Sequence, residues 1–413
     1  MRSRLYALSV LLATAALAAT GKCYEIALSD IPAGNTTKES MPTGNQEAGG
    51  GQSAQSERSA HQGPNAVTGN TPLVSDNWEI AATLVGHKDV VKSLAFSPDG
   101  KRLFSGSLDG EIKVWEMHTR KELASIIAQK DGKRSMVLAV SPSGDVLASG
   151  VGSIPGEVKV WDARTLQLRA TLSYPRPVYC IAFSSKSDLI GAAGEHEVYV
   201  WSVGDSRQKY KIPVGIWPIT GLAFSPDGRV LYVGGFPAIG KVAASSGILH
   251  AWDLFKGMQL GEIKFSCPIE GIALSGDGNT LAVAAVALYV LDVLSENDRV
   301  MFKERFSVLD KQWRGNVPIF QEQFRCVALS PSQKAVAGAA GSPGPLAPEV
   351  GNVALFALHD GRKIARLETP RQANGQVKAG NYDVSSLAFS PDGKLLASGS
   401  KHIITIWTPA ASK

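Results

Sequence analysis

The sequence lacks most of the signals that would indicate an enzyme or a metalloprotein. Only 4 of its 413 residues are cysteines, and none forms a C-x-x-C pair, which gives no support for haem attachment or a zinc ribbon. It contains no H-E-x-x-H pattern, phosphate-binding glycine loop, nucleophile elbow or calcium loop. Its 7 histidines are scattered singly, whereas a metal site needs three or four converging ligands. We therefore predict no catalytic residues, no cofactor and no metal, and a protein that is not an enzyme.

An extreme charge is also missing. The formal net charge is +5 over 413 residues, and charged residues make up 19% of the chain. So modest a balance indicates no dedicated nucleic-acid surface. The hydrophobic content of 44% is enough for a sizeable core, so we expect a globular protein that does not bind nucleic acid.

One long stretch has no large apolar residue other than methionine and valine. Between Pro32 and Pro72 there is no Leu, Ile, Phe, Trp or Tyr, whereas Gly, Ser, Thr, Asn and Gln are frequent. Such a segment cannot bury enough apolar surface to offset the entropy that it would lose on ordering. We predict a flexible tether over residues 19–75.

The N-terminus has a different character. The opening MRSR is basic, and the run from Leu5 to Ala18 is apolar and ends in small residues. This pattern is typical of a secretory signal peptide, and the run is too short for a lasting membrane span. We predict a signal peptide at 1–18 and export to the periplasm, the cell envelope or the extracellular space; an uncleaved N-terminal anchor is the alternative. Lipid attachment at Cys23 is not expected, because Lys22 stands where a lipoprotein cleavage site has a small residue.

What the chain does have is one pattern that recurs seven times: an apolar run ending in a phrase such as AFSPDG, a second apolar run, and a third that closes on a large apolar residue. The phrases lie at 93–100, 138–144, 181–187, 222–228, 272–278, 327–333 and 387–393. The closing residues are Trp115, Trp161, Trp201, Trp252, Leu291, Phe356 and Trp407. Self-similarity at a period of roughly 40–50 residues, with four short strands per unit, is typical of propeller blades. We predict an all-β fold over 76–413, a seven-bladed β-propeller of four-stranded antiparallel blades.

The repeat resembles the WD-repeat family. The first unit, GHKDVVKSLAFSPDGKRLFSGSLDGEIKVWE at 86–116, carries the Gly-His, the Pro-Asp-Gly turn, the Ser-Gly-Ser strand and the Asp-Gly turn before Trp. The resemblance covers about 78–408. It implies a polar network within the blade with a structural role, formed by His87, Ser105, Asp109 and Trp115. Later units lose parts of it, since Leu291 and Phe356 replace Trp, so those blades should rely on apolar packing.

Small residues recur at one position of the innermost strand, which packs against neighbouring blades. They are Ser93, Val137, Cys180, Gly221, Gly271, Cys326 and Ser386. Two of them are cysteines in different units, and we expect both to be buried free thiols.

The two ends of the repeat region complement each other. The last unit ends at Trp407 and lacks a fourth strand, whereas WEIAATL at 78–84 precedes the first unit and has the texture of a fourth strand. We expect this N-terminal strand to complete the last blade, which would close the ring and remove open sheet edges.

The insertions should all lie on one face. Turns between first and second strands, and between third and fourth strands, are short. The long connections join second to third strands or one blade to the next, and they occupy 151–157, 235–247, 310–323, 341–351 and 370–383. Strands alternate in direction, so these connections share one side, here called the long-loop face. Insertions on one face of a repeat protein often mark the binding face; neutral drift is the alternative.

Tryptophan and arginine, which often anchor interfaces, occur on the long-loop face. The insertion at 310–323 is the strongest candidate because an exposed Trp beside cations favours docking. The candidate partner-binding residues are Lys311, Trp313, Arg314, Phe320, Arg176, Trp217, Arg371 and Lys378. For Trp217, capping of the core is an equally good interpretation.

Two functions remain open. The first is a non-catalytic, exported, monomeric scaffold that binds protein partners through the long-loop face. The second is a secreted propeller enzyme, a hydrolase or lyase, with a site at the mouth of the central channel. A cluster of titratable side chains in one pocket would favour the enzyme, and a broad apolar and aromatic surface would favour the scaffold.

Overall fold

The computed structural model describes residues 78–129, 136–237, 246–296, 298–308, 311–314, 317–320, 323–341, 352–368 and 384–410. These residues form 29 strands, labelled β1 to β29, and no α-helix. None of the described segments is therefore a helix long and apolar enough to cross a membrane. The prediction of an all-β fold is confirmed for this part of the chain.

Five sheets consist of four consecutive strands each, with antiparallel neighbours. The first contains β5 (Met136–Val140), β6 (Val146–Val151), β7 (Gly156–Asp162) and β8 (Leu168–Tyr174). The second contains β9 (Cys180–Phe183), β10 (Leu189–Ala193), β11 (Glu197–Ser202) and β12 (Gln208–Pro213). The third contains β13 (Ile216–Phe224), β14 (Val230–Pro237), β15 (Gly247–Asp253) and β16 (Met258–Phe265). The fourth contains β17 (Gly271–Leu274), β18 (Thr280–Ala284), β19 (Leu288–Glu296) and β20 (Arg299–Val308). The fifth contains β23 (Gln323–Leu329), β24 (Ala335–Gly341), β25 (Asn352–Ala357) and β26 (Lys363–Glu368).

The remaining large sheet joins the two ends of the strand-forming region. Its seven strands run in the order β27-β28-β29-β1-β2-β3-β4. They are β27 (Ser386–Phe389), β28 (Leu396–Gly399), β29 (Lys401–Pro409), β1 (Trp78–Phe96), β2 (Arg102–Ser107), β3 (Glu111–Glu116) and β4 (Lys121–Ile127). The first part of β1 pairs with β29, from Trp78 opposite Pro409 to Val85 opposite Ile403. Its last part pairs with β2, so β1 is shared by two four-stranded halves.

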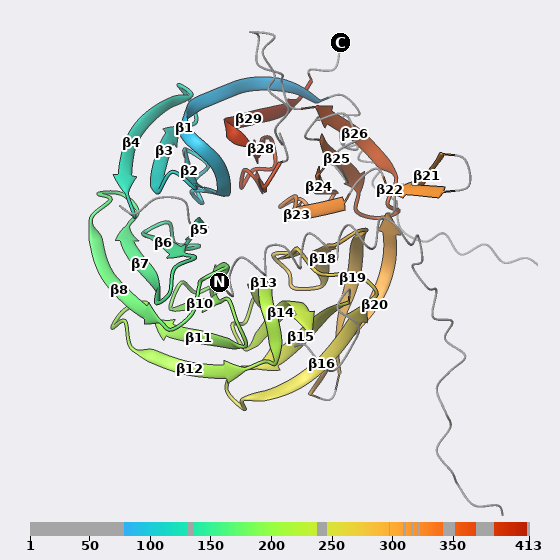
Figure 1. The fold of residues 1–413 in the computed structure, drawn as a ribbon, viewed down its shortest axis with the longest axis horizontal. Helices are drawn as coiled ribbons and strands as arrows, with labels where there is room; N and C mark the ends of the chain where they lie inside the picture. The colour runs from blue at the N-terminus through green and yellow to red at the C-terminus, as the bar shows by residue number, and fades with distance from the viewer. Residues whose placement is uncertain are drawn as a thin grey trace, which may run out of the picture. The chain divides into compact units, whose positions relative to one another are not determined.

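The first strands of successive sheets contact one another. They are β1, β5, β9, β13, β17, β23 and β27, and β27 in turn contacts β1. Figure 1 shows β5, β13 and β23 toward the centre of the ring of sheets, whereas β1 begins at the outer edge and turns inward. Hydrogen bonds link several neighbours: the Leu138 amide donates to Ser93 Oγ over 2.9 Å, and Thr220 Oγ1 donates to the Ile269 carbonyl over 2.6 Å. Ser385 Oγ donates to the Val91 carbonyl over 2.7 Å and so joins β27 to β1.

The core lies between sheets. Each large residue that closes a third strand packs in a cluster with side chains of the preceding sheet: Trp161 with Phe104, for example, and Trp407 with Ala335. Leu291 and Phe356 do the same by apolar contact alone and are 0% and 2% exposed. Leucine and phenylalanine can therefore replace tryptophan at the end of the third strand, because apolar volume at this position matters more than the indole N–H.

Two details differ from the expectations. Residues 310–323, where we expected an insertion between blades, contain a two-stranded hairpin, β21 (Lys311–Arg314) with β22 (Val317–Phe320). Cys180 is a buried free thiol as expected, whereas Cys326 is free but only partly buried, because it lies at the innermost edge of its sheet beside Arg325, which is exposed. Burial raises the pKa of each of these thiols to about 12, so both stay protonated and unreactive at neutral pH.

Candidate protein-binding face

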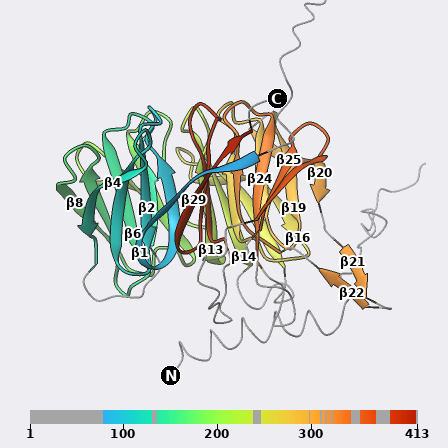
Figure 2. The ribbon, with the colours of Figure 1, turned by 90° about the horizontal axis from the view of Figure 1, so that it is seen from above.

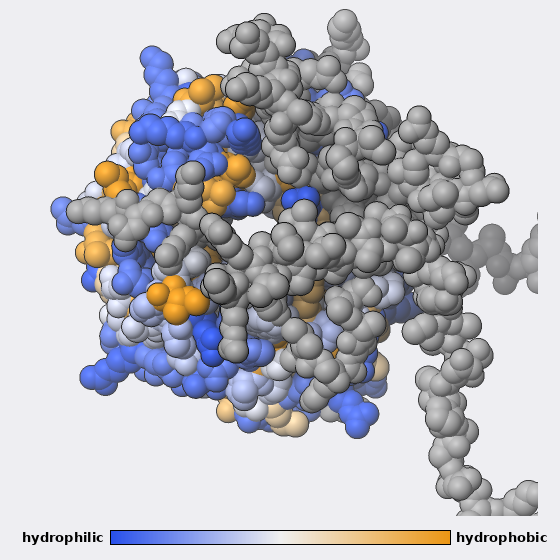
Figure 3. All heavy atoms as spheres, viewed as in Figure 1, coloured by the Kyte–Doolittle hydropathy of each residue, from blue (hydrophilic) through white to orange (hydrophobic). Residues whose placement is uncertain are grey.

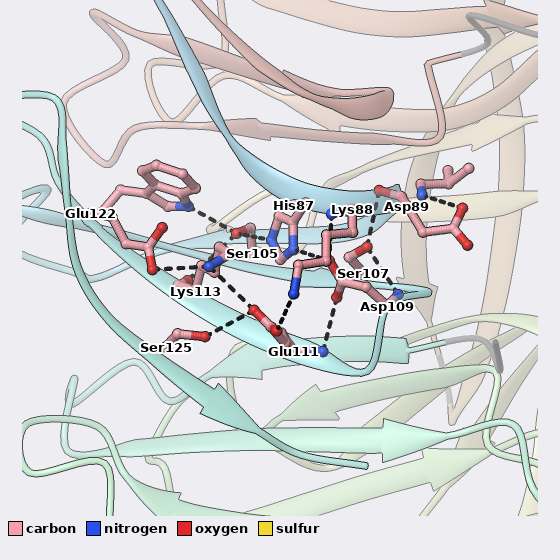
Figure 4. A network of polar contacts seen from close by, with 12 residues as sticks. His87, Lys88, Asp89, Ser105, Ser107, Asp109, Glu111, Lys113, Glu122 and Ser125 are labelled. Carbon is pink, nitrogen blue, oxygen red and sulfur yellow. Dashed lines mark hydrogen bonds and ion pairs between the residues drawn. The ribbon is translucent and has the colours of Figure 1, made fainter. Parts of the chain in front are cut away.

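Hydrogen bonds join the four residues of the expected polar network along the β2–β3 pair. His87 Nε2 lies 2.8 Å from Ser105 Oγ, and His87 Nδ1 lies 2.9 Å from Asp109 Oδ2. The indole N–H of Trp115 donates to the same Ser105 oxygen over 2.9 Å. Figure 4 shows this chain of contacts, which ties the connection after the first part of β1 to the second and third strands of its sheet.

The network holds its carboxylate in the ionised form. Burial alone would raise the pKa of Asp109, but hydrogen bonds from His87 and from the amides of Lys88 and Glu111 outweigh it and lower that pKa to about 2. His87 is only 5% exposed and Ser105 is not exposed at all. Groups enclosed in this way are positioned to stabilise the sheet, and they present nothing to a ligand.

Other sheets keep part of this arrangement. Trp161 donates to Ser149 Oγ over 2.9 Å, and Trp407 donates to Ser398 Oγ over 2.8 Å. In the β13–β16 sheet Val233 occupies the matching position, and the buried Nε1 of Trp252 has no hydrogen-bond partner. This sheet therefore has valine where the others have a serine hydroxyl, but it has the same tryptophan.

A stacked pair of aromatic rings lies where β11 begins and β13 begins. The rings of His196 and Trp217 are 5.8 Å apart at their centroids and 14° from parallel. His196 is exposed, whereas Trp217 is half-buried. The backbone of His196 has φ +60° and is held by its own amide, which donates to the Ile216 carbonyl, and by its carbonyl, which accepts from the Val214 amide, each over 2.9 Å.

An ion pair adjoins this stack. Arg176 Nη1 lies 3.5 Å from Glu195 Oε2, and the Arg176 side chain is 56% exposed. Glu195 directly precedes His196 in the chain, so one backbone segment carries a member of the ion pair and a member of the stack. Tyr179 belongs to the same group, since its pKa is raised by burial and then by the charge of Glu195.

A third feature is a ring of residues that each stand one position before the small residue of an innermost strand. We call it the mouth ring; its members are Lys92, Met136, Tyr179, Thr220, Glu270, Arg325 and Ser385. These residues stand at corresponding positions of seven neighbouring first strands, and Met136 among them is fully buried in the core. Figure 3 shows a central opening on this side of the molecule. Three of its members carry charge, namely Lys92, Glu270 and Arg325.

Glu270 is exposed by area, yet burial raises the pKa of its carboxyl, with Arg325 and then Lys92 acting in the opposite direction. An exposed surface and a pKa raised by burial are compatible if the carboxyl lies at a narrow opening, where water reaches it although protein atoms surround it. Neighbouring backbone is close, because a Cβ added at Gly271 would lie 3.8 Å from the Arg325 carbonyl oxygen.

The ends of the innermost strands β9, β13 and β17 border a hollow of about 350 Å³, which reaches the first-to-second-strand turns at Ser185, Pro226 and Gly276. Its lining includes Phe183, Leu222, Phe224, Ile272 and Leu274, with Ser and Gly as its polar members and no titratable side chain. In the described part of the chain, no group of three or more His, Cys, Asp or Glu is placed to hold a metal ion. The hollow thus offers apolar contact and no acid–base chemistry.

The sequence-predicted partner residues are brought together only in part. Arg176 and Trp217 contact two consecutive residues, Glu195 and His196 respectively. Lys311, Trp313, Arg314 and Phe320 lie on the β21–β22 hairpin, with Trp313 opposite Pro318; their side chains are outside the described structure. Figure 2 shows the hairpin at one edge of the molecule. Arg371 and Lys378 lie outside the described residues.

The most informative residues of this face were not predicted from the sequence. His196 is one of the singly scattered histidines, and its stacking on Trp217 joins positions 21 residues apart in the chain. The mouth ring does have a signal in the sequence, since its members immediately precede the small residues that the repeat aligns. Alignment of the repeats one position earlier would have shown its charges.

Comparison with known proteins supports the repeat. The family model for the WD domain, G-beta repeat, matches residues 78–116 and 374–408. The chain is 26% identical over 202 residues to periodic tryptophan protein 2 of Arabidopsis thaliana, covering 48% of this chain and 21% of that protein. Its identity to periodic tryptophan protein 2 of Saccharomyces cerevisiae is 28% over 191 residues, covering 36% and 21%.

A shorter protein is also similar. The guanine nucleotide-binding protein G(I)/G(S)/G(T) subunit beta-1 of Homarus americanus is 22% identical over 172 residues, which cover 41% of this chain and 50% of that one. The chain thus spans only about a fifth of the length of the periodic tryptophan proteins that it matches. It contains WD40 repeats at both ends of its strand-forming region, and its relatives are WD-repeat proteins.

Proposed function

We propose that this protein is a non-catalytic scaffold, a closed seven-bladed WD40 propeller that binds other proteins through its long-loop face. WD40 repeat proteins generally act as protein-interaction scaffolds, and the matched proteins are of that kind. The observation that carries the proposal is the stack of exposed His196 on half-buried Trp217, next in the chain to the Arg176–Glu195 pair. Aromatic and arginine side chains at one place on a rigid sheet edge are the composition of a binding hot spot.

The number and closure of the blades are supported by strand pairing. Five four-stranded sheets and the two halves of the seven-stranded sheet give seven blades. The first strands contact one another cyclically, and β1 pairs with β29. A ring that shares β1 between its first and last blades leaves no blade without a fourth strand.

Export is a separate part of the proposal and rests on the sequence. A basic opening, an apolar run and small residues at positions 16 and 18 are what a signal peptidase site requires. The intact mass of the protein recovered from its native compartment should therefore lack residues 1–18. Recovery of the full-length chain from the cytoplasm alone would contradict export.

No described feature favours the alternative of a secreted hydrolase or lyase. The hollow bordered by β9, β13 and β17 is lined without titratable side chains. The mouth ring is charged, but its groups are spread over the starts of three separate strands.

The test is affinity capture from native extract with matched variants. His196→Asn removes the imidazole while Asn still tolerates positive φ, and Trp217→Leu keeps apolar volume. The control, Lys101→Met with Lys186→Met, changes two exposed residues in first-to-second-strand turns, on the opposite face. We expect the His196→Asn/Trp217→Leu protein to melt near the wild-type temperature and to lose partners that the control keeps. Equal capture by all three proteins would overturn the proposed face.

A further inference from the structure

The side chain of His250, on β15, is buried between two sheets without a hydrogen-bond partner. It is 7% exposed, and neither ring nitrogen has a partner among the described residues. Val233, opposite His250 on β14, belongs to the apolar cluster that joins the β9–β12 and β13–β16 sheets. Opposite residues of neighbouring strands point to the same side of a sheet, so the imidazole lies in this interface. The ring of Trp252 is 6.3 Å away, and its buried Nε1 has no partner either.

Other sheets provide a partner for a polar side chain at this repeat position, which stands two residues before the one that closes the third strand. Lys113 Nζ donates to Glu122 Oε1 over 2.9 Å in the first unit, and Lys159 Nζ donates to the Ala128 carbonyl over 2.6 Å in the next. His250 stands at the same position and has no such partner. Its neutral ring already lacks hydrogen bonds, and a second proton would add a charge that apolar neighbours cannot solvate.

One carboxylate lies close to the ring, that of Glu262 opposite His250 on β16. Its Oε2 is 3.6 Å from His250 Nε2, which is beyond hydrogen-bond distance. The same oxygen accepts from Gln259 Nε2 over 3.0 Å, and Lys264 Nζ lies 3.3 Å from Glu262 Oε1. The Glu262 side chain is 42% exposed. A protonated ring therefore has a counter-charge within reach, but it can bind Glu262 only by moving away from the apolar side chains toward the solvent.

The second charged group that acts on the ring is Lys264, also on β16. On β12, Tyr210 packs in the same cluster as Val233, whereas the neighbouring Lys211 lies over the ring of Tyr199, which packs on the other side of that sheet. The cluster members from β9, β10, β11 and β14 are the thiol of Cys180, which burial keeps protonated, and the apolar Leu189, Ala193, Val198, Val200, Leu231 and Val233.

Burial lowers the pKa of His250 below its ordinary value; the charge of Glu262 opposes this shift and that of Lys264 adds to it. The folded protein therefore takes up a proton here less readily than the unfolded chain does. The stability of the neutral, packed state is complete above the ordinary pKa of about 6.5 and is lost as the pH falls through the lower pKa of the folded state. Within that window each pH unit shifts the balance between packed and opened interface by up to about tenfold.

The packing of this interface also positions the stacked rings of the proposed binding face. Ile216 directly precedes Trp217 on β13 and belongs to the cluster. The Ile216 carbonyl accepts from the His196 amide, and the amide of Val214, another member of the cluster, donates to the His196 carbonyl, each over 2.9 Å. Loosening of the cluster would therefore displace both His196 and Trp217.

We propose that His250 is a proton-sensitive switch of partner binding: its protonation drives the imidazole out of the interface toward Glu262, loosens the packing of the β9–β12 and β13–β16 sheets and releases partners held by the His196–Trp217 stack. This inference rests on the proposed scaffold function and adds the regulation of that binding face by acid. Partner affinity should therefore decrease as the pH falls from 7 toward 5.

The first test follows His250 in the full-length protein. With histidine labelled with carbon-13 at Cε1, the NMR signal that is missing in His250→Leu should titrate with a midpoint below about 6.5. Glu262→Gln should lower that midpoint further, because the counter-charge is removed. Amide exchange, corrected for the intrinsic effect of pH, should become at least about fivefold faster in segments 212–219 and 247–252 between pH 7 and 5.5.

Matched variants show whether His250 causes that change. His250→Leu should abolish it. His118→Leu is the control, since it removes an exposed imidazole from a third-to-fourth-strand turn on the opposite face, and it should keep the change in full. Exchange that rises equally in His250→Leu, or a His250 signal with a midpoint above about 6.5, would overturn the inference.

Partner capture tests the regulation. Partners captured from native extract at pH 7 should be retained at least about fivefold less after a wash at pH 5.5 by the wild type, and retained by His250→Leu. His196 is itself an exposed imidazole, so a loss that persists in His250→Leu would assign the pH dependence to His196 and overturn the inference. If the interface opens as predicted while capture is unchanged, the inference alone is wrong. If the wild type captures no partner at pH 7, the scaffold proposal fails and the regulation with it.

Discussion

The indole N–H of Trp115 donates to Ser105 Oγ over 2.9 Å, and the same oxygen lies 2.8 Å from His87 Nε2. One hydroxyl, with no exposed surface, therefore satisfies two buried nitrogens that come from different strands. A buried polar group left without a partner costs more than its hydrogen bond contributes, so this oxygen should be among the most sensitive atoms of the sheet.

Replacement of Ser105 by Ala should destabilise the protein more than replacement of Ser149. Ser105→Ala leaves two nitrogens without their shared partner, whereas Ser149→Ala leaves only the indole of Trp161. With about 1–3 kcal/mol for each unsatisfied group, the two variants should differ by about 1 kcal/mol or more in free energy of unfolding. Urea titration measures this; equal losses would show that the His87 contact contributes nothing.

The indole N–H of Trp252 has no acceptor, so here a hydrogen-bond acceptor can be added instead of removed. Val233 and Val283 occupy the same repeat position and are both 0% exposed, but the residue that closes the third strand is Trp252 in one sheet and Leu291 in the other. Val233→Thr supplies an acceptor to the indole, while Val283→Thr buries a hydroxyl beside leucine. We expect Val233→Thr to be the more stable variant by about 1 kcal/mol. A reversed order in thermal and urea unfolding would mean that the Trp252 nitrogen is already solvated.

Asp109 should contribute stability that depends on pH. Its pKa in the folded protein is about 2, below the value of about 3.9 that an unfolded chain gives. The ionised form therefore stabilises the fold above about pH 4, and this contribution, at most about 2 kcal/mol, disappears as the pH falls through 2. The difference in unfolding free energy between wild type and Asp109→Asn should be largest at pH 5 and shrink toward pH 2. A constant difference would contradict the role of the charge.

Closure through β1 predicts a strong effect of its first part. Leu84 is 2% exposed and packs with Val91, Trp115 and Ile404, so Leu84→Ala should cost about 2–5 kcal/mol. The adjacent Thr83→Ala, on the exposed side of the same strand, should cost about 0.5 kcal/mol or less. Deletion of 76–85 should lower the melting temperature further than either substitution. A deletion protein that melts like the wild type would contradict a closed ring.

The repeat made much of the fold predictable. The apolar period, the recurring AFSPDG phrase and the residues that close the third strands mark the sheets, and WEIAATL has the texture of a missing fourth strand. The hairpin at 310–323 had a signal too, since Gly315-Asn316 between KQWR and VPIF is a typical two-residue hairpin turn. The segment departs from the repeat, so it was interpreted as an insertion and this local turn signal was overlooked.

The candidate site was harder to predict for a physical reason. The His196–Trp217 stack depends on the angle between two neighbouring sheets, and no local pattern encodes that angle. Burial raises the pKa of Glu270, and the cations that oppose this shift, Arg325 and Lys92, lie 55 and 178 positions away in the chain. Such groups become a cluster only when the starts of the first strands are arranged around one opening.

Hydrogen–deuterium exchange of the protein alone and with a captured partner tests the binding face most directly. We predict protection in the segments 176–180, 195–197, 216–220, 269–271 and 324–326, which carry the stacked rings, the ion pair and the charges of the mouth ring. The first-to-second-strand turns at 97–101, 184–188 and 225–229 should exchange at unchanged rates. Protection confined to those turns would place the partner on the opposite face and contradict the account.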